Sequence, residues 1–371
     1  MLIEQQFATI DACRFCFMCR HVCTVGVVSG WESDTPRGKG LILFKILRGH
    51  ATYSDDLVQT IYRCCLCGMC RTWCVGGYTM PEAVLLARSD IVDQGKEPEG
   101  ARKIRANIMA TGNPFGLPAE DRFKAIEDGK VFKDKAEVLY YVGCDTAYYQ
   151  PEIANAFAKI LLRSGVDFTF LRDETSSGKP LSVLGYRNEA NKVAEELWPR
   201  IRSTGCKVLV TTCPNSYDTF KNDYAAMGFD LDGIEVLHAT EYVARLVNEG
   251  RVTPRNALHR SVTPQDSTYL CRFNDACDGL RRVLQGIPGV DLKEMSWTRD
   301  RAHSCGEAGG VLRLLYPELS EELAKRMLEE ASRTAAQELA TACPVTKRSL
   351  ASVNGRGIEI RDVVELFAES L

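Results

Sequence analysis

The chain has 371 residues, 45% of them hydrophobic, and its 46 basic side chains almost balance its 49 acidic ones. This composition excludes wholesale disorder, and a formal net charge of −3 gives no electrostatic reason to expect nucleic-acid binding. No stretch approaches the roughly 18 consecutive apolar residues of a membrane-spanning helix. The first residues lack the basic start and apolar core of a secretory signal, so we expect a cytoplasmic protein.

Cysteine content is the most informative feature of the composition. Nine of the 16 cysteines lie in residues 13–74. A secreted protein held together by disulfides fits poorly, because the chain is far larger than the domains that need such bonds. In a reducing cytosol, cysteines more often bind metal or carry out chemistry. The remaining seven are Cys144, Cys206, Cys213, Cys271, Cys277, Cys305 and Cys343.

Two N-terminal runs share one cysteine spacing. Residues 13–23 read CRFCFMCRHVC and residues 64–74 read CCLCGMCRTWC, so the spacing C-x2-C-x2-C-x3-C occurs twice. In two-cluster ferredoxins this run holds a [4Fe–4S] cluster, and its fourth cysteine binds the other cluster. The sequence therefore predicts two [4Fe–4S] clusters, one held by Cys13, Cys16, Cys19 and Cys74, the other by Cys64, Cys67, Cys70 and Cys23.

Two alternatives stay open for these runs. Each run could hold its cluster with its own four cysteines, or the runs could bind zinc. Zinc sites more often use two CxxC pairs separated by a longer loop, which favours iron–sulfur clusters. Thr24 and Val75 stand where ferredoxin runs usually have proline, without altering the ligands. Cys65 either replaces a ligand or packs as a free thiol.

The sequence around the two runs has helical patterning. Residues 35–40 read TPRGKG and predict a turn, followed by a helix with apolar residues over 41–47, and Pro81 opens another helix. Arg37 and Lys39 either tune a nearby cluster electrostatically or lie in a surface turn. We predict a helical two-cluster domain over residues 1–105 and a linker over 106–135.

The sequence pattern changes to alternating strands and helices from about residue 136. Such alternation implies a parallel sheet with right-handed crossovers. We predict an α/β repeat over residues 136–255 and a second over 256–371. The expected strands are 137–142, 166–171, 207–212 and 234–237 in the first repeat, and 267–270, 290–295 and 338–342 in the second.

Matched intervals between cysteines and serines indicate an internal duplication. Cys144 lies 32 residues before Ser176, and Cys271 lies 33 residues before Ser304. The predicted strands end just before these cysteines, where open α/β sheets bind ligands. A shared site explains the placement better than scattered buried thiols do.

With these motifs, the chain resembles the iron–sulfur subunits that carry two cysteine-rich CCG repeats behind a two-cluster ferredoxin domain. That family includes catalytic subunits of heterodisulfide reductase and iron–sulfur subunits of glycolate, lactate and anaerobic glycerol-3-phosphate dehydrogenases. The resemblance covers nearly the whole chain and rests on both cysteine runs, both repeats, residues 35–39 (TPRGK) and residues 112–116 (GNPFG). It implies an α+β multi-domain chain, with a helical two-[4Fe–4S] ferredoxin-like domain followed by a duplicated α/β parallel-sheet CCG-type domain.

The repeats depart from the family pattern of a lone Cys, a Cys-Cys-Gly some 32 residues later, and a Cys-Pro-x-Cys. Hydroxyl side chains replace half of these cysteines, and a hydroxyl is a poor substitute for a thiolate at iron. The first repeat is therefore not expected to hold a cluster. The replaced positions are Ser176, Ser177, Ser216, Ser304 and Thr346.

The resemblance leaves five cysteines for a third metal centre. Cys271, Cys305 and Cys343 would supply three ligands, and Cys213 or Cys144 would complete the set from the other repeat. His303 is a further candidate ligand. A cubane is favoured over a non-cubane cluster, with zinc behind both.

The function that the resemblance favours is electron transfer within a multi-subunit oxidoreductase. The chain would relay single electrons between a flavoprotein dehydrogenase and a quinone or another redox protein, in the cytoplasm or at the inner face of the membrane through its partners. No catalytic residues are recognisable, and residues 306–310 (GEAGG) lack a dinucleotide-binding context, so we expect them to approach a metal site closely. The alternatives are a heterodisulfide or thiol–disulfide reductase, against which the serines argue, and an assembly scaffold.

Overall fold

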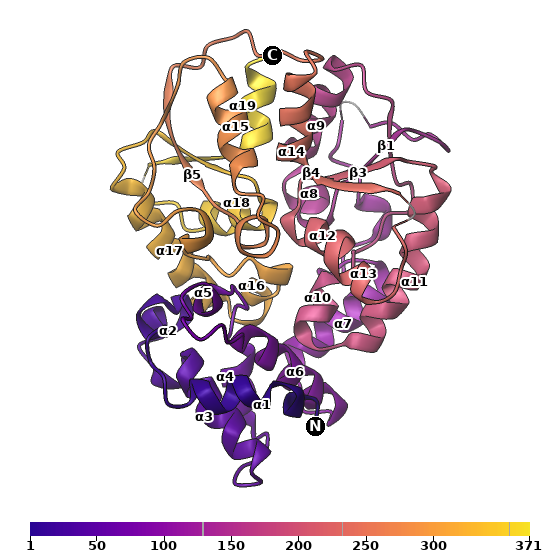
Figure 1. The fold of residues 1–371 in the computed structure, drawn as a ribbon. Coiled ribbons are helices and arrows are strands. Elements are labelled where there is room, and N and C mark those ends of the chain that lie inside the picture. The colour runs from indigo at the N-terminus through magenta and orange to yellow at the C-terminus, as the bar shows by residue number, and fades with distance from the viewer. Residues whose placement is uncertain (128–129, 232, 356) are drawn as a thin grey trace.

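A computed structural model describes residues 1–127, 130–231, 233–355 and 357–371 of the chain. A helical N-terminal part lies against two α/β lobes, each with its own parallel sheet (Figure 1). The C-terminus lies at the end of the molecule farthest from the N-terminal helices (Figure 1). None of the helices in the described residues combines the length and apolar character that crossing a membrane requires.

Residues 1–127, all described, form helices and turns and contain no strand. Apolar side chains such as Ile10, Leu43, Ile61 and Val84 are fully buried between these helices. The predicted boundary at residue 105 falls inside the last of the main helices. These are α1 (Phe7–Cys13), α2 (Thr24–Ser29), α3 (Pro36–Leu47), α4 (Asp55–Tyr62), α5 (Met69–Thr72), α6 (Met80–Asp93) and α7 (Glu99–Thr111), with 3₁₀ turns at Leu2–Gln6, Arg20–Val22, Glu32–Asp34 and Ala119–Asp121.

The turn predicted over residues 35–40 is wrong, because α3 already begins there. Thr35 is the N-cap, and its Oγ1 accepts a hydrogen bond from the Gly38 backbone N–H at 3.1 Å. Pro36 occupies the first helical turn, where its missing N–H costs nothing. A capping threonine followed by proline is a helix-start signal, which the glycines obscured. The helix opened by Pro81 is confirmed as α6.

The first sheet has the order β2-β1-β3-β4, with every pair parallel. Its predicted strands are confirmed within a few residues, and β1 and β2 are buried throughout because helices cover both faces of the sheet. The elements are β1 (Val138–Tyr141), α8 (Cys144–Tyr149), α9 (Pro151–Arg163), β2 (Phe168–Phe170), α10 (Lys179–Leu184), α11 (Arg187–Ser203), β3 (Val208–Thr211), α12 (Pro214–Asp218), the π-helical η5 (Thr219–Asp223), α13 (Tyr224–Ala226), β4 (Glu235–His238) and α14 (Ala239–Asn248).

The second sheet repeats this topology with the order β6-β5-β7-β8. Helix α9 packs on α19, and α14 packs on α15, so the two lobes share one continuous hydrophobic core (Figure 1). The elements are β5 (Arg260–Gln265), the π-helical η6 (Tyr269–Phe273), α15 (Asp278–Gly286), β6 (Val290–Leu292), the 3₁₀ turns η7 (Arg299–Arg301) and η8 (Ala308–Gly310), α16 (Leu312–Leu315), α17 (Pro317–Ser332), β7 (Glu338–Thr341), α18 (Pro344–Ala351), β8 (Glu359–Asp362) and α19 (Val363–Glu369).

The strand predicted over residues 267–270 is wrong. The strand is β5, and it ends at Gln265. Pro264 obscured it, but β6 pairs with β5 only as far as Val262, so the missing N–H of Pro264 interrupts no ladder on that side. By register, Gln265 corresponds to Tyr141, so Cys271 lies three residues farther from its strand than Cys144 does. The prediction also missed β8.

A buried histidine predicts acid sensitivity of the fold. His238 caps α14 and is 1% exposed, and burial lowers the pKa of its imidazole to about 4. Below about pH 6.5 the His238 imidazole is protonated in the unfolded chain but stays neutral in the folded chain. The free energy of unfolding therefore falls as the pH drops from about 6.5 to about 4. We expect this group to cost about 3 kcal/mol over that range. Urea unfolding of the wild type and of His238→Gln at several pH values checks it: equal losses in the two proteins would contradict the expectation.

Candidate iron–sulfur sites and the cysteines of the repeats

The first candidate site gathers cysteines from two distant segments. Cys13 ends α1, Cys16 and Cys19 lie in the loop after it, and Cys74 lies just beyond α5. These four line one cavity of about 200 Å³. Burial, followed by repulsion from the thiolates of Cys74 and Cys16, raises the pKa of the Cys13 thiol to about 11.

The second candidate site has the complementary composition. Cys23, the N-cap of α2, shares a smaller cavity with Cys64, Cys67 and Cys70. Burial raises the pKa of Cys23 to about 12, opposed by the charge of Lys39. The neighbouring Cys65 lines the same cavity, and its hydrogen bond to Cys67 lowers the pKa of that thiol to about 6.

The structure thus places the fourth cysteine of each run beside the first three cysteines of the other run. This is the arrangement that crossed cluster ligation requires. Each cavity is lined by the four thiols of its predicted set, with Cys70 bordering both cavities and Cys65 also lining the second, and four thiols fit a [4Fe–4S] cluster. Cys65 is buried, and its thiol hydrogen-bonds that of Cys67.

The two sites differ in their distance from solvent. Cys16 is exposed, and the exposed side chains of Met18 and Val75 border the first cavity. Phe15 and Phe17, in the same loop, are each 68% exposed. The second site instead faces the second lobe, so the first site lies nearer the outer surface.

Direct contacts join the second site to η6 of the second lobe. Arg272 Nη1 donates a hydrogen bond to the Cys67 carbonyl at 3.0 Å, and Arg71 Nη2 donates one to the Arg272 carbonyl at 2.6 Å. Gly68 has a φ of +72°, and a Cβ atom there would lie 3.1 Å from the Phe273 ring. The loop that carries Cys67 is therefore held against the turn that carries Cys271.

Cys144 of the first repeat has a charged partner in the structure. Cys144 begins α8, and Arg122 Nη2 lies 3.4 Å from its sulfur. Glu174 holds that guanidinium at 2.9 Å. Burial raises the pKa of Cys144, and the charge of Arg122 opposes the shift. Ser176 is buried nearby, where the family pattern has a cysteine.

Three other cysteines gather where the two repeats meet. Cys305 Sγ lies 3.6 Å from Thr346 Oγ1, and both residues are buried. Burial raises the pKa of the Cys343 thiol well above its ordinary value, and the nearby Cys213 and Glu307 add repulsion. The Thr346 hydroxyl, at a position where the family pattern has a cysteine, and the Glu307 carboxylate thus lie beside these thiols.

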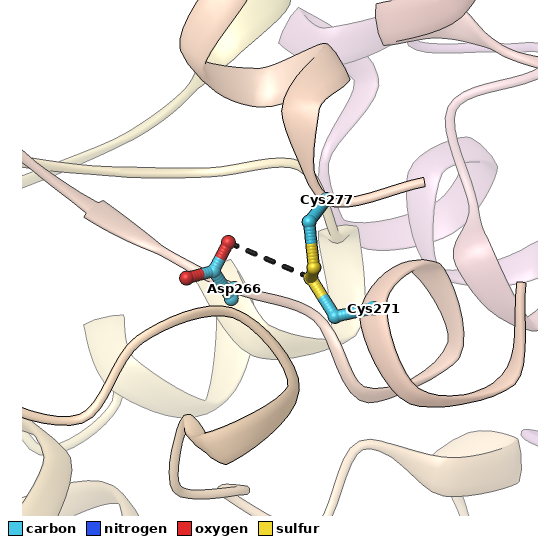
Figure 2. A group of neighbouring side chains, drawn as sticks. All are labelled: Asp266, Cys271 and Cys277. Atoms are coloured by element: carbon cyan, nitrogen blue, oxygen red, sulfur yellow. Dashed lines mark hydrogen bonds between the residues drawn. A yellow bond between two sulfur atoms is a disulfide. The ribbon is translucent and has the colours of Figure 1, made fainter. Parts of the chain in front are cut away.

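Cys271 has a different partner, which the sequence did not predict. Its sulfur is bonded to Cys277, and Asp266 lies beside the pair (Figure 2). Within the part of the chain that the structure describes, these three residues form the one group of three metal-ligating side chains whose donor atoms all lie within 4.8 Å. The sequence offered one signal for this pairing, namely that Cys271 and Cys277 are only six residues apart.

The remaining candidates contact other protein groups in the structure. His303 Nδ1 lies 2.9 Å from Glu330 Oε2, and its ring stacks on Trp297. The glycine run approaches other groups closely: a Cβ atom at Gly309 would lie 2.3 Å from Val183 of α10. Its approach to a metal site stays a prediction. These glycines let the second lobe pack against the first.

Comparisons with known proteins agree with the duplicated lobes. The model of the cysteine-rich CCG domain matches residues 138–220 and 265–349. Over its full length the chain is 28% identical to a dihydromethanophenazine:CoB–CoM heterodisulfide reductase subunit of Methanosarcina acetivorans, covering 96% of that protein. The chain is 31% identical to "Probable iron-sulfur-binding oxidoreductase FadF" of Bacillus subtilis over 84% of its own length. It is 28% identical to EtfAB:quinone oxidoreductase of Syntrophomonas wolfei over 68% of its own length. The chain covers 47% and 37% of these two proteins.

Proposed function

Because this chain belongs to the family of iron–sulfur oxidoreductase proteins that carry the cysteine-rich CCG domain, we propose that it is the electron-transfer subunit of a multi-subunit oxidoreductase. It relays single electrons between a flavoprotein dehydrogenase and a quinone or another redox protein. The observation that carries the proposal is the interleaving of the two cysteine runs around two neighbouring cavities. We assign one [4Fe–4S] cluster to Cys13, Cys16, Cys19 and Cys74, and the other to Cys64, Cys67, Cys70 and Cys23.

The surroundings of the two sites support a path in which the first site exchanges electrons with a partner protein and the second site lies farther along, beside the repeats. The first site borders exposed apolar side chains, among them Met18 and Val75, which suit contact with a partner protein. The second site lies against η6 of the second lobe. When bound, the clusters supply one-electron transfer, and the chain positions them between its surface and its repeats. The name of one relative, an EtfAB:quinone oxidoreductase, agrees with this class of acceptor. We keep the cytoplasmic location as a prediction.

A thiol–disulfide or heterodisulfide reductase is the second candidate function. The full-length similarity to a heterodisulfide reductase subunit favours it. The hydroxyl side chains at Ser176, Ser177, Ser304 and Thr346 oppose it, because they remove the thiolates that a cluster in the repeats would need. A third centre at Cys271, Cys305 and Cys343, completed by Cys213 or Cys144, stays a prediction.

Iron analysis and EPR of anaerobically purified protein test the relay. We expect about eight irons per chain and a [4Fe–4S] signal that appears on reduction with dithionite. Colourless protein, or far fewer irons after reconstitution, would overturn the proposal. A paramagnetic signal elicited from oxidised protein only by a thiol substrate would favour the reductase instead.

Lys39 offers a test of the second site through its reduction potential. Its side chain is 2% exposed, lines the cavity with Cys23, and hydrogen-bonds the Asp34 carbonyl. A buried positive charge favours the reduced, more negative cluster. We expect Lys39→Met to lower the midpoint potential of this cluster by about 60 mV or more, a tenfold change in a one-electron equilibrium. EPR-monitored redox titration measures the shift.

Lys45 provides the matched control on the same helix. It is exposed, so Lys45→Met is expected to leave both midpoint potentials unchanged. Equal potentials in the Lys39 variant and the wild type would show that the cluster does not sense this charge.

A further inference from the structure

The disulfide between Cys271 and Cys277 has no role in the proposed relay. Cys271 lies within η6, and Cys277 is the residue before α15. Their Cα atoms are 4.6 Å apart, a separation that disulfides commonly have. Disulfides in a reducing cytosol are usually transient and redox-active rather than structural. Figure 2 shows the pair joining the two helical segments.

A buried carboxylate with its own hydrogen-bond donors lies beside the pair. Asp266 directly follows β5 and is 2% exposed, and its Oδ1 atom lies 3.6 Å from Cys271 Sγ (Figure 2). Arg281 of α15 donates to both carboxylate oxygens, at 2.7 and 2.9 Å, and the Arg299 backbone N–H donates at 2.6 Å. In the reduced state the Asp266 carboxylate can accept a hydrogen bond from a Cys271 thiol, so the site accommodates both oxidation states.

The pair also lies next to the second candidate cluster. Arg272, adjacent to Cys271 in the chain, donates its hydrogen bond to the carbonyl of Cys67, which we assign as a cluster ligand. Arg71 returns a hydrogen bond to the Arg272 carbonyl, and Phe273 packs against Gly68. The turn that carries the disulfide is thus fastened directly to the loop that would hold the cluster.

We propose that Cys271 and Cys277 form a redox-active dithiol that exchanges electrons with the second cluster. On reduction the S–S bond between Cys271 and Cys277 breaks, and the two sulfurs take up two electrons and two protons from water to become thiols. The second cluster, when bound, would supply these electrons one at a time. Oxidation reverses the step, returning two electrons to the cluster and two protons to solvent. The inference rests on the proposed function, because the relay supplies these electrons. It gives a one-electron relay a two-electron store.

Thiol mapping of the anaerobic holoprotein tests the pair. Trypsin cleaves after Arg272 and Arg281, so Cys271 and Cys277 fall in separate peptides, residues 261–272 and 273–281. We expect these peptides to be disulfide-linked in ferricyanide-oxidised protein. After reduction with dithionite, acid quenching and alkylation in denaturant, both should carry the alkyl group. Free thiols in both states would overturn the proposal.

A serine variant connects the pair to electron transfer. Cys277→Ser is expected to take up two fewer electrons per chain in a reductive titration while keeping its iron content and EPR signals. Cys206→Ser, which removes a buried free thiol elsewhere in the chain, should take up as many electrons as the wild type. Unchanged electron uptake in Cys277→Ser would overturn the proposal. So would a loss of about four irons per chain in Cys271→Ser, because it would show that Cys271 is a cluster ligand and not a disulfide partner.

The proposed function and the dithiol can fail separately. In one case the chain holds no iron, but the two peptides are linked and dithiothreitol releases them. The relay then fails, and the exchange of electrons with a cluster fails with it, although the disulfide itself is real. If the N-terminal clusters are present while Cys271 and Cys277 remain free thiols, the relay stands and the dithiol is wrong.

Discussion

Replacement of Cys74 by serine is expected to remove the first cluster and leave the second. Cys74 belongs by sequence to the run that begins at Cys64, but it lines the cavity formed by Cys13, Cys16 and Cys19. If each run held its own cluster, the same variant would remove the second cluster instead. We expect iron to fall by about half, from roughly eight to roughly four per chain. EPR of the reduced protein identifies which cluster remains.

The reciprocal variant and a control complete this test. Cys23→Ser is expected to remove the cluster of the second cavity. The cluster that remains in Cys74→Ser should change its midpoint potential when Lys39→Met is added. The cluster that remains in Cys23→Ser should not, and this difference tells the two clusters apart. Cys65→Ser removes a buried thiol of the same segment and is expected to keep all the iron. Loss of the Lys39-sensitive cluster in Cys74→Ser would show that each run binds its own cluster.

Arg88→Met is expected to destabilise the fold strongly. Arg88 lies on α6 and is 1% exposed. Its guanidinium donates to the Val183 carbonyl of the first lobe at 2.6 Å, and to the Tyr62 and Cys64 carbonyls at 3.0 and 2.5 Å. Methionine leaves these buried acceptors without donors. Hydrogen bonds from a charged group contribute about 1.5–3 kcal/mol each, so we expect a loss of about 3 kcal/mol or more.

Urea unfolding of the holoprotein, followed by circular dichroism and by cluster absorbance, measures this loss. The Cys64 carbonyl belongs to a cluster ligand in our assignment, so bleaching should begin at lower urea than in the wild type. Arg105→Met serves as the control, because Arg105 is 45% exposed and its ion pair with Glu189 lies at the surface. That control is expected to change stability by no more than about 1 kcal/mol. Equal unfolding midpoints for both variants would contradict the role of Arg88.

The cysteines of the repeats show which positions local sequence patterns can predict and which they cannot. Strands β1, β3 and β7 were predictable because buried parallel strands are short apolar runs, and Cys144, Cys213 and Cys343 follow them closely. The position of Cys271 was not predictable in this way. The three additional residues after β5 precede a π-helical turn, and a spacing-based alignment of the repeats cannot distinguish such an insertion from a longer strand.

By itself, the sequence determined the duplicated parallel α/β architecture and the two cysteine runs, because strand periodicity and ligand spacing are local properties of the chain. Only the tertiary structure decided which cysteines share a cavity, that Cys271 meets Cys277 beside Asp266, and that Lys39 and Arg88 are buried. Arg88 reaches Val183 across 95 residues. No local pattern encodes such a contact, since it depends on how the finished helices and sheets pack.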